Sequence, residues 1–98
     1  MKTYFTYMMT NKNKTVIYIG MTNNIFRRVM EHKNHENPTS FTARYNVDRL
    51  VWIELFYTAG EAIAREKQLK GGSRGKKEAL INIENPNWED LWEKWRDM

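Results

Sequence analysis

The stretch from residue 16 to residue 32 limits the possible folds more than any other part of the chain. Its first four residues, Val16-Ile17-Tyr18-Ile19, are β-branched or aromatic, which is typical of a strand. Gly20 then interrupts the strand pattern, and Thr22 or Asn23 can cap a following helix. We therefore predict a strand that leads through a short turn into a helix.

The helix after this turn carries polar groups beside its apolar stripe. Apolar residues recur there at helical spacing, and they are Ile25, Phe26, Val29 and Met30. Arg28 and His32 lie four residues apart at the edge of the stripe, so their side chains point the same way. We expect the strand and the helix to bring Tyr18, Arg28 and His32 to one corner of the fold.

A second strand is predicted upstream, over residues 3–9, with Asn11-Lys12-Asn13-Lys14 as the turn between the two strands. A turn that is symmetric about its two central residues pairs Tyr7 directly with Tyr18. Their Cβ atoms would then lie about 5 Å apart on one face of the sheet. A slip of one residue would turn one of the two rings to the opposite face.

Residues 50–57 have the clearest strand pattern in the chain. Alternate residues point to opposite faces, with Val51, Ile53 and Leu55 on one side and Trp52, Glu54 and Phe56 on the other. Bulky side chains on both faces indicate a strand that helices cover on both sides. We expect Glu54 to form a structural ion pair with a neighbouring Arg or Lys.

The next helix has well-marked ends. Thr58 and Glu61 have the spacing of a capping box at its start, and Gly71-Gly72 ends it. Its apolar stripe consists of Ala59, Ala62, Ile63 and Leu69. Glu66 falls in the same row, where an unpaired carboxylate would be costly. Glu66 therefore needs a partner, and a divalent cation and Arg28 are the two candidates.

Two more helices are predicted after this glycine pair. Ser73 can cap the first, Asn85-Pro86 ends it, and Asn87 can cap a last helix over about residues 87–97. The apolar residues of this last helix recur at helical spacing and are Trp88, Leu91, Trp92 and Trp95. Core packing is their simplest role, because the acidic residues around them would repel the phosphates of a stacked nucleic acid.

These elements define the expected architecture. Their order is strand, strand, helix, strand, helix, helix, helix. We predict a single domain over residues 1–98 of the α/β (α+β) class, with a small three-stranded, mainly antiparallel sheet flanked by helices on both faces. Its core spans about residues 4–83, and the Trp-rich helix follows. A chain of 98 residues can bury one hydrophobic core.

The charge of the chain is unevenly distributed. The formal net charge is +4 at pH 7, yet the residues from Glu84 on include five acidic and two basic ones. The excess positive charge therefore lies in the first 83 residues, which favours a polyanionic partner. Many small proteins are equally basic without binding nucleic acid. The candidate phosphate contacts are Arg27, Arg44, Lys67, Lys70, Arg74 and Lys76.

Two absences from the sequence restrict the class of protein. There is no cysteine, which excludes disulfides, thiolate nucleophiles and zinc–thiolate sites. There is also no signal-peptide pattern and no apolar run of about 18 residues. We therefore expect a cytoplasmic protein that does not associate with membranes.

Taken in order, the motifs resemble those of the GIY-YIG nuclease domain. Phe5-Thr6-Tyr7, Tyr18-Ile19-Gly20 with Thr22, and Arg28 with His32 follow the order of the family. Further motifs resemble its short stand-alone bacterial type (YazA/YhbQ-like), which is related to the N-terminal domain of an excision-repair endonuclease: Ala62 to Lys70 with Glu66 at its centre, and Leu80 to Pro86. The resemblance covers about residues 4–91. The first triplet departs from the family pattern by lacking its Gly and Ile, two positions that carry no chemistry.

The resemblance implies a metal-dependent endonuclease that hydrolyses phosphodiester bonds in DNA, of the structure-specific repair or recombination type. Arg28 would bind phosphate oxygens, and Glu66 would hold a single Mg²⁺ or Mn²⁺ ion. Tyr7 would be the general base with Tyr18 as its orienting partner, or His32 would replace either as proton shuttle. A phenol can serve as base only if nearby cations lower its pKa. Three further matches are structural or possible site positions, namely Gly20, Thr22 and Asn85.

Two other functions fit the same residues. The first is a nucleic-acid-binding module that keeps the scaffold and has weak or no catalysis. The second is a basic structural protein that binds no nucleic acid. The sequence shows no additional DNA-binding domain. Target choice is therefore expected to come from this small body or from a protein partner, and we expect a monomer.

Overall fold

The computed structural model describes residues 2–37 and 39–96. Three strands and five helices follow one another as β1 (Tyr4–Thr10), β2 (Ile17–Thr22), α1 (Ile25–Lys33), α2 (Phe41–Arg44), β3 (Arg49–Phe56), α3 (Ala59–Lys70), α4 (Arg74–Glu84) and α5 (Leu91–Arg96). The predicted order is confirmed, and α2 is a short additional helix.

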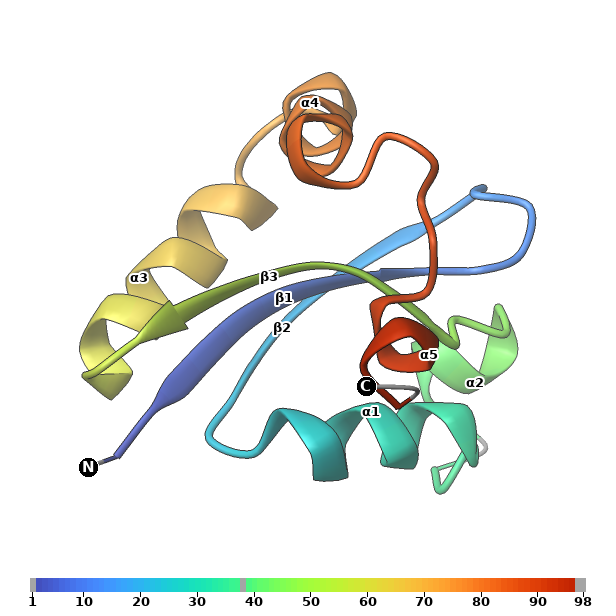
Figure 1. Cartoon of the computed structure of the whole chain (residues 1–98), viewed down its shortest axis with the longest axis horizontal. Coiled ribbons are helices and arrows are strands. Elements are labelled where there is room, and N and C mark those ends of the chain that lie inside the picture. The colour runs from blue at the N-terminus through green and yellow to red at the C-terminus, as the bar shows by residue number, and fades with distance from the viewer. Residues whose placement is uncertain (1, 38, 97–98) are drawn as a thin grey trace.

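The sheet separates two helical layers, as the α+β prediction requires. β1 is the central strand and pairs antiparallel with both β2 and β3. Helices α3 and α4 cover one face of the sheet, and α1, α2 and α5 lie on the other (Figure 1). The buried residues divide in the same way. The α3–α4 cluster includes Met8, Val51, Trp52, Leu69, Ile81 and Trp88. The α1–α5 cluster includes Tyr7, Met9, Ile25, Val29 and Leu50.

The register of the first hairpin differs from the predicted one. Tyr7 pairs with Gly20, and Tyr18 pairs with Met9. The connection spans residues 11–16 instead of the predicted 11–14, and β2 begins only at Ile17. Within it, the Asn11 side chain accepts a hydrogen bond from the backbone N–H of Thr15 (2.8 Å). The tyrosines are thus diagonal neighbours. They still share a face of the sheet, with ring centroids 6.2 Å apart.

A β-bulge changes which face of the sheet some side chains of β3 point to. The pairing of β1 with β3 shifts between Met8, which pairs with Trp52, and Met9, which pairs with Leu50. The extra residue breaks the strict alternation of the strand. Val51 consequently joins Trp52 in the α3–α4 cluster, while Ile53 packs against the α1–α5 cluster. The prediction that Val51 and Ile53 share a face is therefore wrong.

Side-chain caps explain where the helices begin. Thr58 and Ser73 cap α3 and α4 as predicted, and Gly71 ends α3. The cap of α1 is Asn24 rather than Thr22 or Asn23, and its side chain accepts from the N–H of Arg27. The Thr22 hydroxyl instead accepts from the N–H of Asn24 (3.1 Å), which shapes the turn from β2 into α1.

The C-terminal helix is shorter than predicted. It begins at Leu91, and Trp88 precedes it with a positive φ of 52°, so the four apolar residues do not form one stripe. Trp88 belongs to the α3–α4 cluster, whereas Trp92 and Trp95 contact Phe26 on the other face. Residue 97, the last of the predicted helix, lies outside the described residues.

The predicted ion pair of Glu54 is present, and its partner is Arg65 at 2.8 Å. Within residues 2–37 and 39–96, no helix combines the length and apolar character needed to cross a membrane.

Candidate active site

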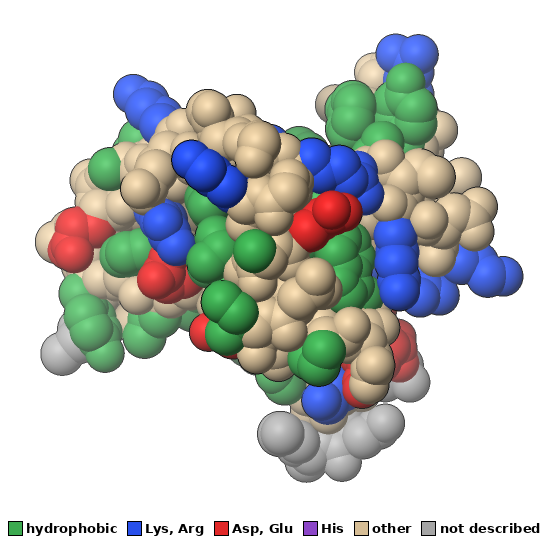
Figure 2. All heavy atoms as spheres, turned by 90° about the horizontal axis from the view of Figure 1, so that it is seen from above, with side chains coloured by type: hydrophobic (Ala, Val, Ile, Leu, Met, Phe, Trp, Pro, Cys, Tyr) green, Lys and Arg blue, Asp and Glu red, His purple; other side chains and the backbone are tan. Residues whose placement is uncertain are grey.

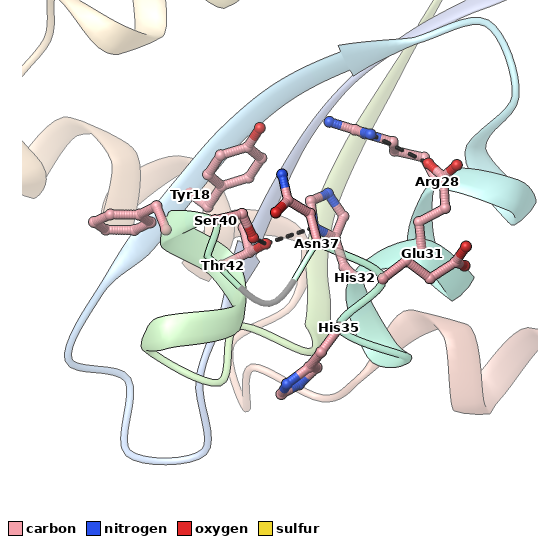
Figure 3. Close-up of a pocket in the computed structure, with 10 residues that line it drawn as sticks. Tyr18, Arg28, Glu31, His32, His35, Asn37, Ser40 and Thr42 are labelled. Atoms are coloured by element: carbon pink, nitrogen blue, oxygen red, sulfur yellow. Dashed lines mark hydrogen bonds and ion pairs between the residues drawn. The ribbon is translucent and has the colours of Figure 1, made fainter.

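A cavity of about 420 Å³ opens between β2, α1 and the start of α2. It is lined by Tyr18 of β2, Arg28 and His32 of α1, and Phe41 and Thr42 of α2, together with part of the loop between the two helices (Figure 3). Side chains alternate between the two faces of a strand and return to the same face of a helix every 3.6 residues, so these groups point toward the same place. The predicted meeting of Tyr18, Arg28 and His32 is confirmed.

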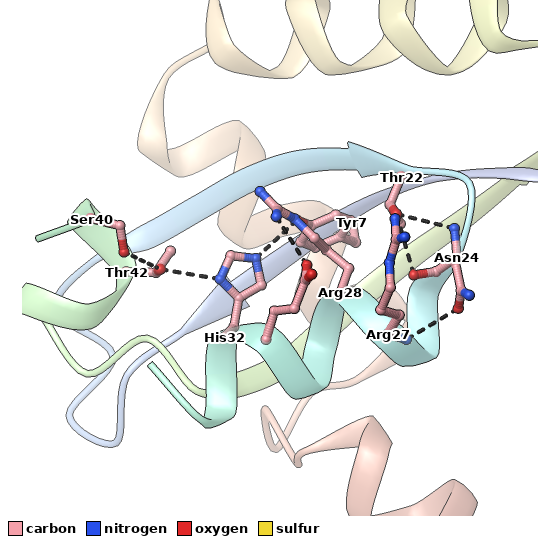
Figure 4. A network of polar contacts seen from close by, with 9 residues as sticks. Tyr7, Thr22, Asn24, Arg27, Arg28, His32, Ser40 and Thr42 are labelled. Atoms are coloured by element: carbon pink, nitrogen blue, oxygen red, sulfur yellow. Dashed lines mark hydrogen bonds and ion pairs between the residues drawn. The ribbon is translucent and has the colours of Figure 1, made fainter. Parts of the chain in front are cut away.

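The hydroxyl of Tyr7 is the centre of the polar network at this cavity (Figure 4). It accepts a hydrogen bond from Arg28 Nε at 3.3 Å and bonds to His32 Nε2 at 3.0 Å. A guanidinium can only donate, so the Tyr7 oxygen is the acceptor in the bond to Arg28, while the direction of the bond to His32 follows the tautomer of the imidazole. On the other side of the ring, His32 Nδ1 is hydrogen-bonded to the Thr42 hydroxyl at 3.1 Å, which lies 3.1 Å from the Ser40 hydroxyl. A continuous chain of hydrogen bonds thus runs from Tyr7 to α2.

Gly20 makes room for the Tyr7 ring. A Cβ at this position would overlap the Tyr7 hydroxyl oxygen and lie 2.6 Å from Cζ. Gly20 faces Tyr7 across the hairpin, so its missing side chain lets the phenol extend over the edge strand β2. The glycine of the Tyr-Ile-Gly motif is therefore needed for the position of the tyrosine.

Burial and the neighbouring cation act in opposite directions on Tyr7. Burial raises the pKa of the phenol, and the hydrogen bond from Arg28 lowers it by less, so the pKa of Tyr7 stays well above its usual value. The same hydrogen bond raises the pKa of Arg28, as does Glu31, whose carboxylate lies 3.2 Å from Arg28 Nη1. Arg28 thus lowers the pKa of Tyr7, but by less than burial raises it, so the condition for a phenolate base is not met by these residues alone.

His32 is held in the neutral form. Its side chain is buried, and burial together with the Arg28 charge lowers its pKa to about 4. A neutral imidazole keeps one unprotonated ring nitrogen, and here Nε2 faces Tyr7 while Nδ1 faces Thr42. His32 is therefore a proton acceptor at neutral pH.

The pKa of His32 predicts a loss of stability in mild acid. The unfolded chain binds a proton at a pKa of about 6.5 and the folded one at about 4, so the free energy of unfolding falls as the pH drops between these values, by about 3 kcal/mol at most. Urea unfolding at pH 7.5 and pH 4.5 should show a larger drop for the wild type than for His32→Gln. Equal drops in the two proteins would contradict the buried neutral state.

Glu66 is separated from these groups by the sheet. It lies on α3, on the opposite face from α1, and does not line the cavity. Its half-buried carboxylate lies 3.6 Å from Lys70 Nζ, so Arg28 is not its ion-pair partner. Its charge nevertheless contributes to the raised pKa of Tyr7, which indicates that its field reaches the phenol. Among the described residues, no three His, Cys, Asp or Glu side chains gather in a metal-binding arrangement.

The side chain of Asn85 forms hydrogen bonds that hold the fold together. Its buried side chain donates to the carbonyls of Val51 (3.1 Å) and Glu89 (2.9 Å) and accepts from the N–H of Glu89. These bonds connect the end of α4 to β3. The structure does not bring Asn85 to the cavity.

The predicted phosphate contacts fall into separate groups. Arg27 borders a shallow depression next to Arg28, and Arg44 lies on α2. Lys67 and Lys76 line a groove between α3 and α4, the face on which several Lys and Arg side chains are seen in Figure 2. Two others have partners within the protein. Lys70 pairs with Glu66, and Arg74 donates to the carbonyls of Lys14 and Thr15 in the hairpin loop.

Several polar residues that line the cavity are absent from the predicted site residues, among them Glu31, Ser40 and Thr42. Glu31 lies three residues after Arg28, so helical spacing alone would have indicated the ion pair between them. Ser40 and Thr42 continue the hydrogen-bond chain beyond His32, and no sequence pattern connects them to it. Their place depends on how the loop after α1 folds back.

Comparison with known proteins identifies the family of this chain. Residues 3–79 match the profile of the GIY-YIG catalytic domain. A UPF0213 protein of Natronomonas pharaonis is 36% identical over 78 residues, covering 80% of this chain and 89% of that protein. A UPF0213 protein of Staphylococcus saprophyticus is 33% identical over 82 residues, covering 84% and 98%.

A solved structure has the same fold. The solution NMR structure of a UPF0213 protein from Bacillus halodurans superimposes with a TM-score of 0.57 at 27% sequence identity, covering 91% of this chain and 93% of that one. Profile, sequence relatives and solved structure all cover most of the chain. The chain therefore belongs to the GIY-YIG catalytic domain family and is similar to its UPF0213 proteins.

Proposed function

We propose that this protein is a metal-dependent endonuclease that hydrolyses phosphodiester bonds in DNA, with structure-specific substrates of the repair or recombination type. The observation that carries the proposal is the convergence of Arg28 and His32 on the hydroxyl of Tyr7 beside one cavity. Membership of a family whose domains are typically nucleases supports it. The excess of basic residues before Glu84 supports a nucleic acid substrate.

Arg28 binds the scissile phosphate in this proposal. Its side chain is 40% exposed and lines the cavity, and its raised pKa keeps it cationic. A planar guanidinium matches two phosphate oxygens at once. The bonds to Tyr7 and Glu31 hold the side chain in place before the substrate arrives, so less ordering is needed as charge develops on the phosphoryl oxygens.

Tyr7 and His32 handle the proton of the attacking water. With His32 in the tautomer that carries its proton on Nδ1, the Tyr7 hydroxyl oxygen takes a proton from the water while the phenol passes its own proton to His32 Nε2. This paired transfer avoids a free phenolate, which burial of the phenol disfavours. The Tyr18 ring packs at 6.2 Å from the Tyr7 ring and 5.2 Å from the His32 ring, and orients both.

Glu66 is the residue that would hold the divalent cation. Its carboxylate is half-buried, and its ion pair with the exposed Lys70 is long at 3.6 Å, which leaves oxygen available to a hard cation. A single protein carboxylate with water in the remaining positions suits Mg²⁺, which gives up its water reluctantly. When bound, the ion would supply positive charge within reach of the Tyr7 phenol, on which the Glu66 carboxylate already acts.

The alternative function is a nucleic-acid-binding module with weak or no catalysis. The observation that favours it is the position of Glu66, which lies across the sheet from Arg28 and outside the cavity. Under either function, we propose that the protein is a monomer and that a protein partner directs it to its target.

A cleavage screen tests the proposed function. We expect the protein to nick branched, flapped or single-stranded DNA with Mg²⁺ or Mn²⁺, and to leave the same substrates intact in EDTA. Fluorescently labelled duplex, flap, junction and single-stranded substrates of DNA and RNA make up the panel. Binding without any metal-dependent product would support the binding module. An absence of salt-dependent affinity for every substrate would contradict both functions.

Direct metal binding separates the role of Glu66 from cleavage. We expect Glu66→Gln to abolish cleavage and to weaken Mn²⁺ binding at least about tenfold, measured by water proton relaxation, because a first carboxylate ligand is lost. Glu61→Gln, on the exposed start of the same helix, is the matched control and should bind Mn²⁺ as the wild type does. Equal Mn²⁺ affinity for wild type and Glu66→Gln would remove Glu66 from the metal site.

A further inference from the structure

Two large aromatic side chains are exposed on α2. Phe41 is 47% exposed and Tyr45, directly after the helix, is 43% exposed. They lie four residues apart, so they share one side of the turn, and their ring centroids are 4.7 Å apart. Neither ring belongs to the two buried clusters of the fold. Core packing therefore does not account for this pair.

The pair continues into the candidate active site. The Phe41 ring stacks on the Tyr18 ring at a centroid distance of 6.5 Å and an interplanar angle of 28°. Tyr18 and Phe41 both line the cavity that holds Arg28 and His32, and Figure 3 shows the Tyr18 ring on the α2 side of that cavity. Tyr18, Phe41 and Tyr45, here called the aromatic row, thus lead from the cavity to the exposed side of α2.

A cation lies beside the outer end of the aromatic row, and two carboxylates, Glu31 and Glu36, line the cavity at its inner end. The Arg44 guanidinium lies 5.8 Å from the centroid of the Tyr45 ring. Within the cavity, the carboxylate of Glu31 is paired with Arg28. Exposed aromatic faces next to cations are the arrangement by which proteins hold single-stranded nucleic acid, because bases stack on the rings and cations follow the backbone.

We propose that the aromatic row is a stacking site for an unpaired nucleobase next to the scissile phosphate. The inference rests on the proposed function and names its substrate class, since a base within a duplex is covered on both faces by its neighbours and cannot offer one to Phe41. An unpaired nucleotide gains this contact when its phosphate reaches Arg28. The site thereby selects nucleic acid with an unpaired base at the cleavage position.

Binding without metal tests the aromatic row separately from cleavage. The probes are a fluorescein-labelled single-stranded oligothymidylate and a duplex of the same length, in EDTA at low salt, followed by fluorescence anisotropy. Loss of one base–ring contact corresponds to a drop in affinity of about 5- to 100-fold. We expect this drop for Phe41→Leu with the single strand only, and near wild-type affinity for Phe41→Trp, which keeps an aromatic face.

Tyr57→Leu is the matched control, because Tyr57 is 59% exposed and belongs to the connection between β3 and α3. It should bind both probes as the wild type does. Equal affinity of wild type and Phe41→Leu for the single strand would overturn the stacking site and leave the proposed function standing. Equal losses on both probes would also overturn it. A wild type that binds neither probe at low salt would overturn the proposed function itself.

Discussion

Arg28→Lys is expected to lower the single-turnover rate of DNA cleavage by about 100- to 1000-fold, the usual effect of removing one preorganised donor to a developing negative charge. Lysine keeps the positive charge but has neither the planar fork nor an Nε to bond Tyr7. The Tyr7 hydroxyl oxygen would lose the donor that holds it at 3.3 Å from Arg28 Nε. Quenched-flow assays on a flapped substrate with Mn²⁺ measure the rate.

The folded state should tolerate this substitution. The Arg28 side chain is 40% exposed and its ion pair with Glu31 is at the surface, so the free energy of unfolding should change by less than about 1 kcal/mol. Arg65→Lys is the control, because Arg65 forms a comparable ion pair with Glu54 away from the cavity. A wild-type cleavage rate in Arg28→Lys would show that the guanidinium does not act in the reaction.

Gly20→Ala is expected to damage both stability and cleavage. The added methyl group would overlap the Tyr7 hydroxyl oxygen and Cζ, and the ring is fully buried, so it has little room to move. Overpacking of this kind costs about 1–3 kcal/mol. Displacing the phenol from Arg28 and His32 by about 1 Å should lower the cleavage rate on the order of 100-fold. Urea unfolding and single-turnover cleavage measure the two effects.

Gly60→Ala is the matched control for this prediction. A Cβ at Gly60 meets nothing within 4 Å, and the residue lies in the first turn of α3. The substitution should therefore stabilise the protein by about 0.4–1 kcal/mol through the unfolded state. If Gly20→Ala were as stable and as active as the wild type, the close approach of Tyr7 to β2 would not matter for either property.

Local sequence patterns predicted the helices and strands of this fold better than the register in which the strands pair. Thr58 and Ser73 cap their helices because capping depends on residues three positions apart. The hairpin register depended instead on the Asn11 side chain, which lengthens the connection. The bulge at Met8 and Met9 arises from the pairing of distant strands, so no pattern within β3 alone predicts that Val51 changes face.

The candidate site shows the same division. Tyr18, Arg28 and His32 converge because strand and helix periodicities are local and β2 leads directly into α1. Tyr7 joins them because a register change of two residues leaves its face unchanged. Thr42 depends on the course of the loop after α1, and the distance of Glu66 from the cavity depends on how α3 packs across the sheet. Neither is contained in a local pattern.

The most direct test is to compare wild type, Arg28→Lys and Glu66→Gln in one single-turnover assay with Mn²⁺, with DNA affinity measured in parallel. The central claim predicts that both variants bind DNA within tenfold of the wild type but cut it at least about 100 times more slowly. If both variants cut at the same trace rate as the wild type, the cluster around Tyr7 does not hydrolyse DNA, and the protein is a nucleic-acid-binding module on a nuclease scaffold.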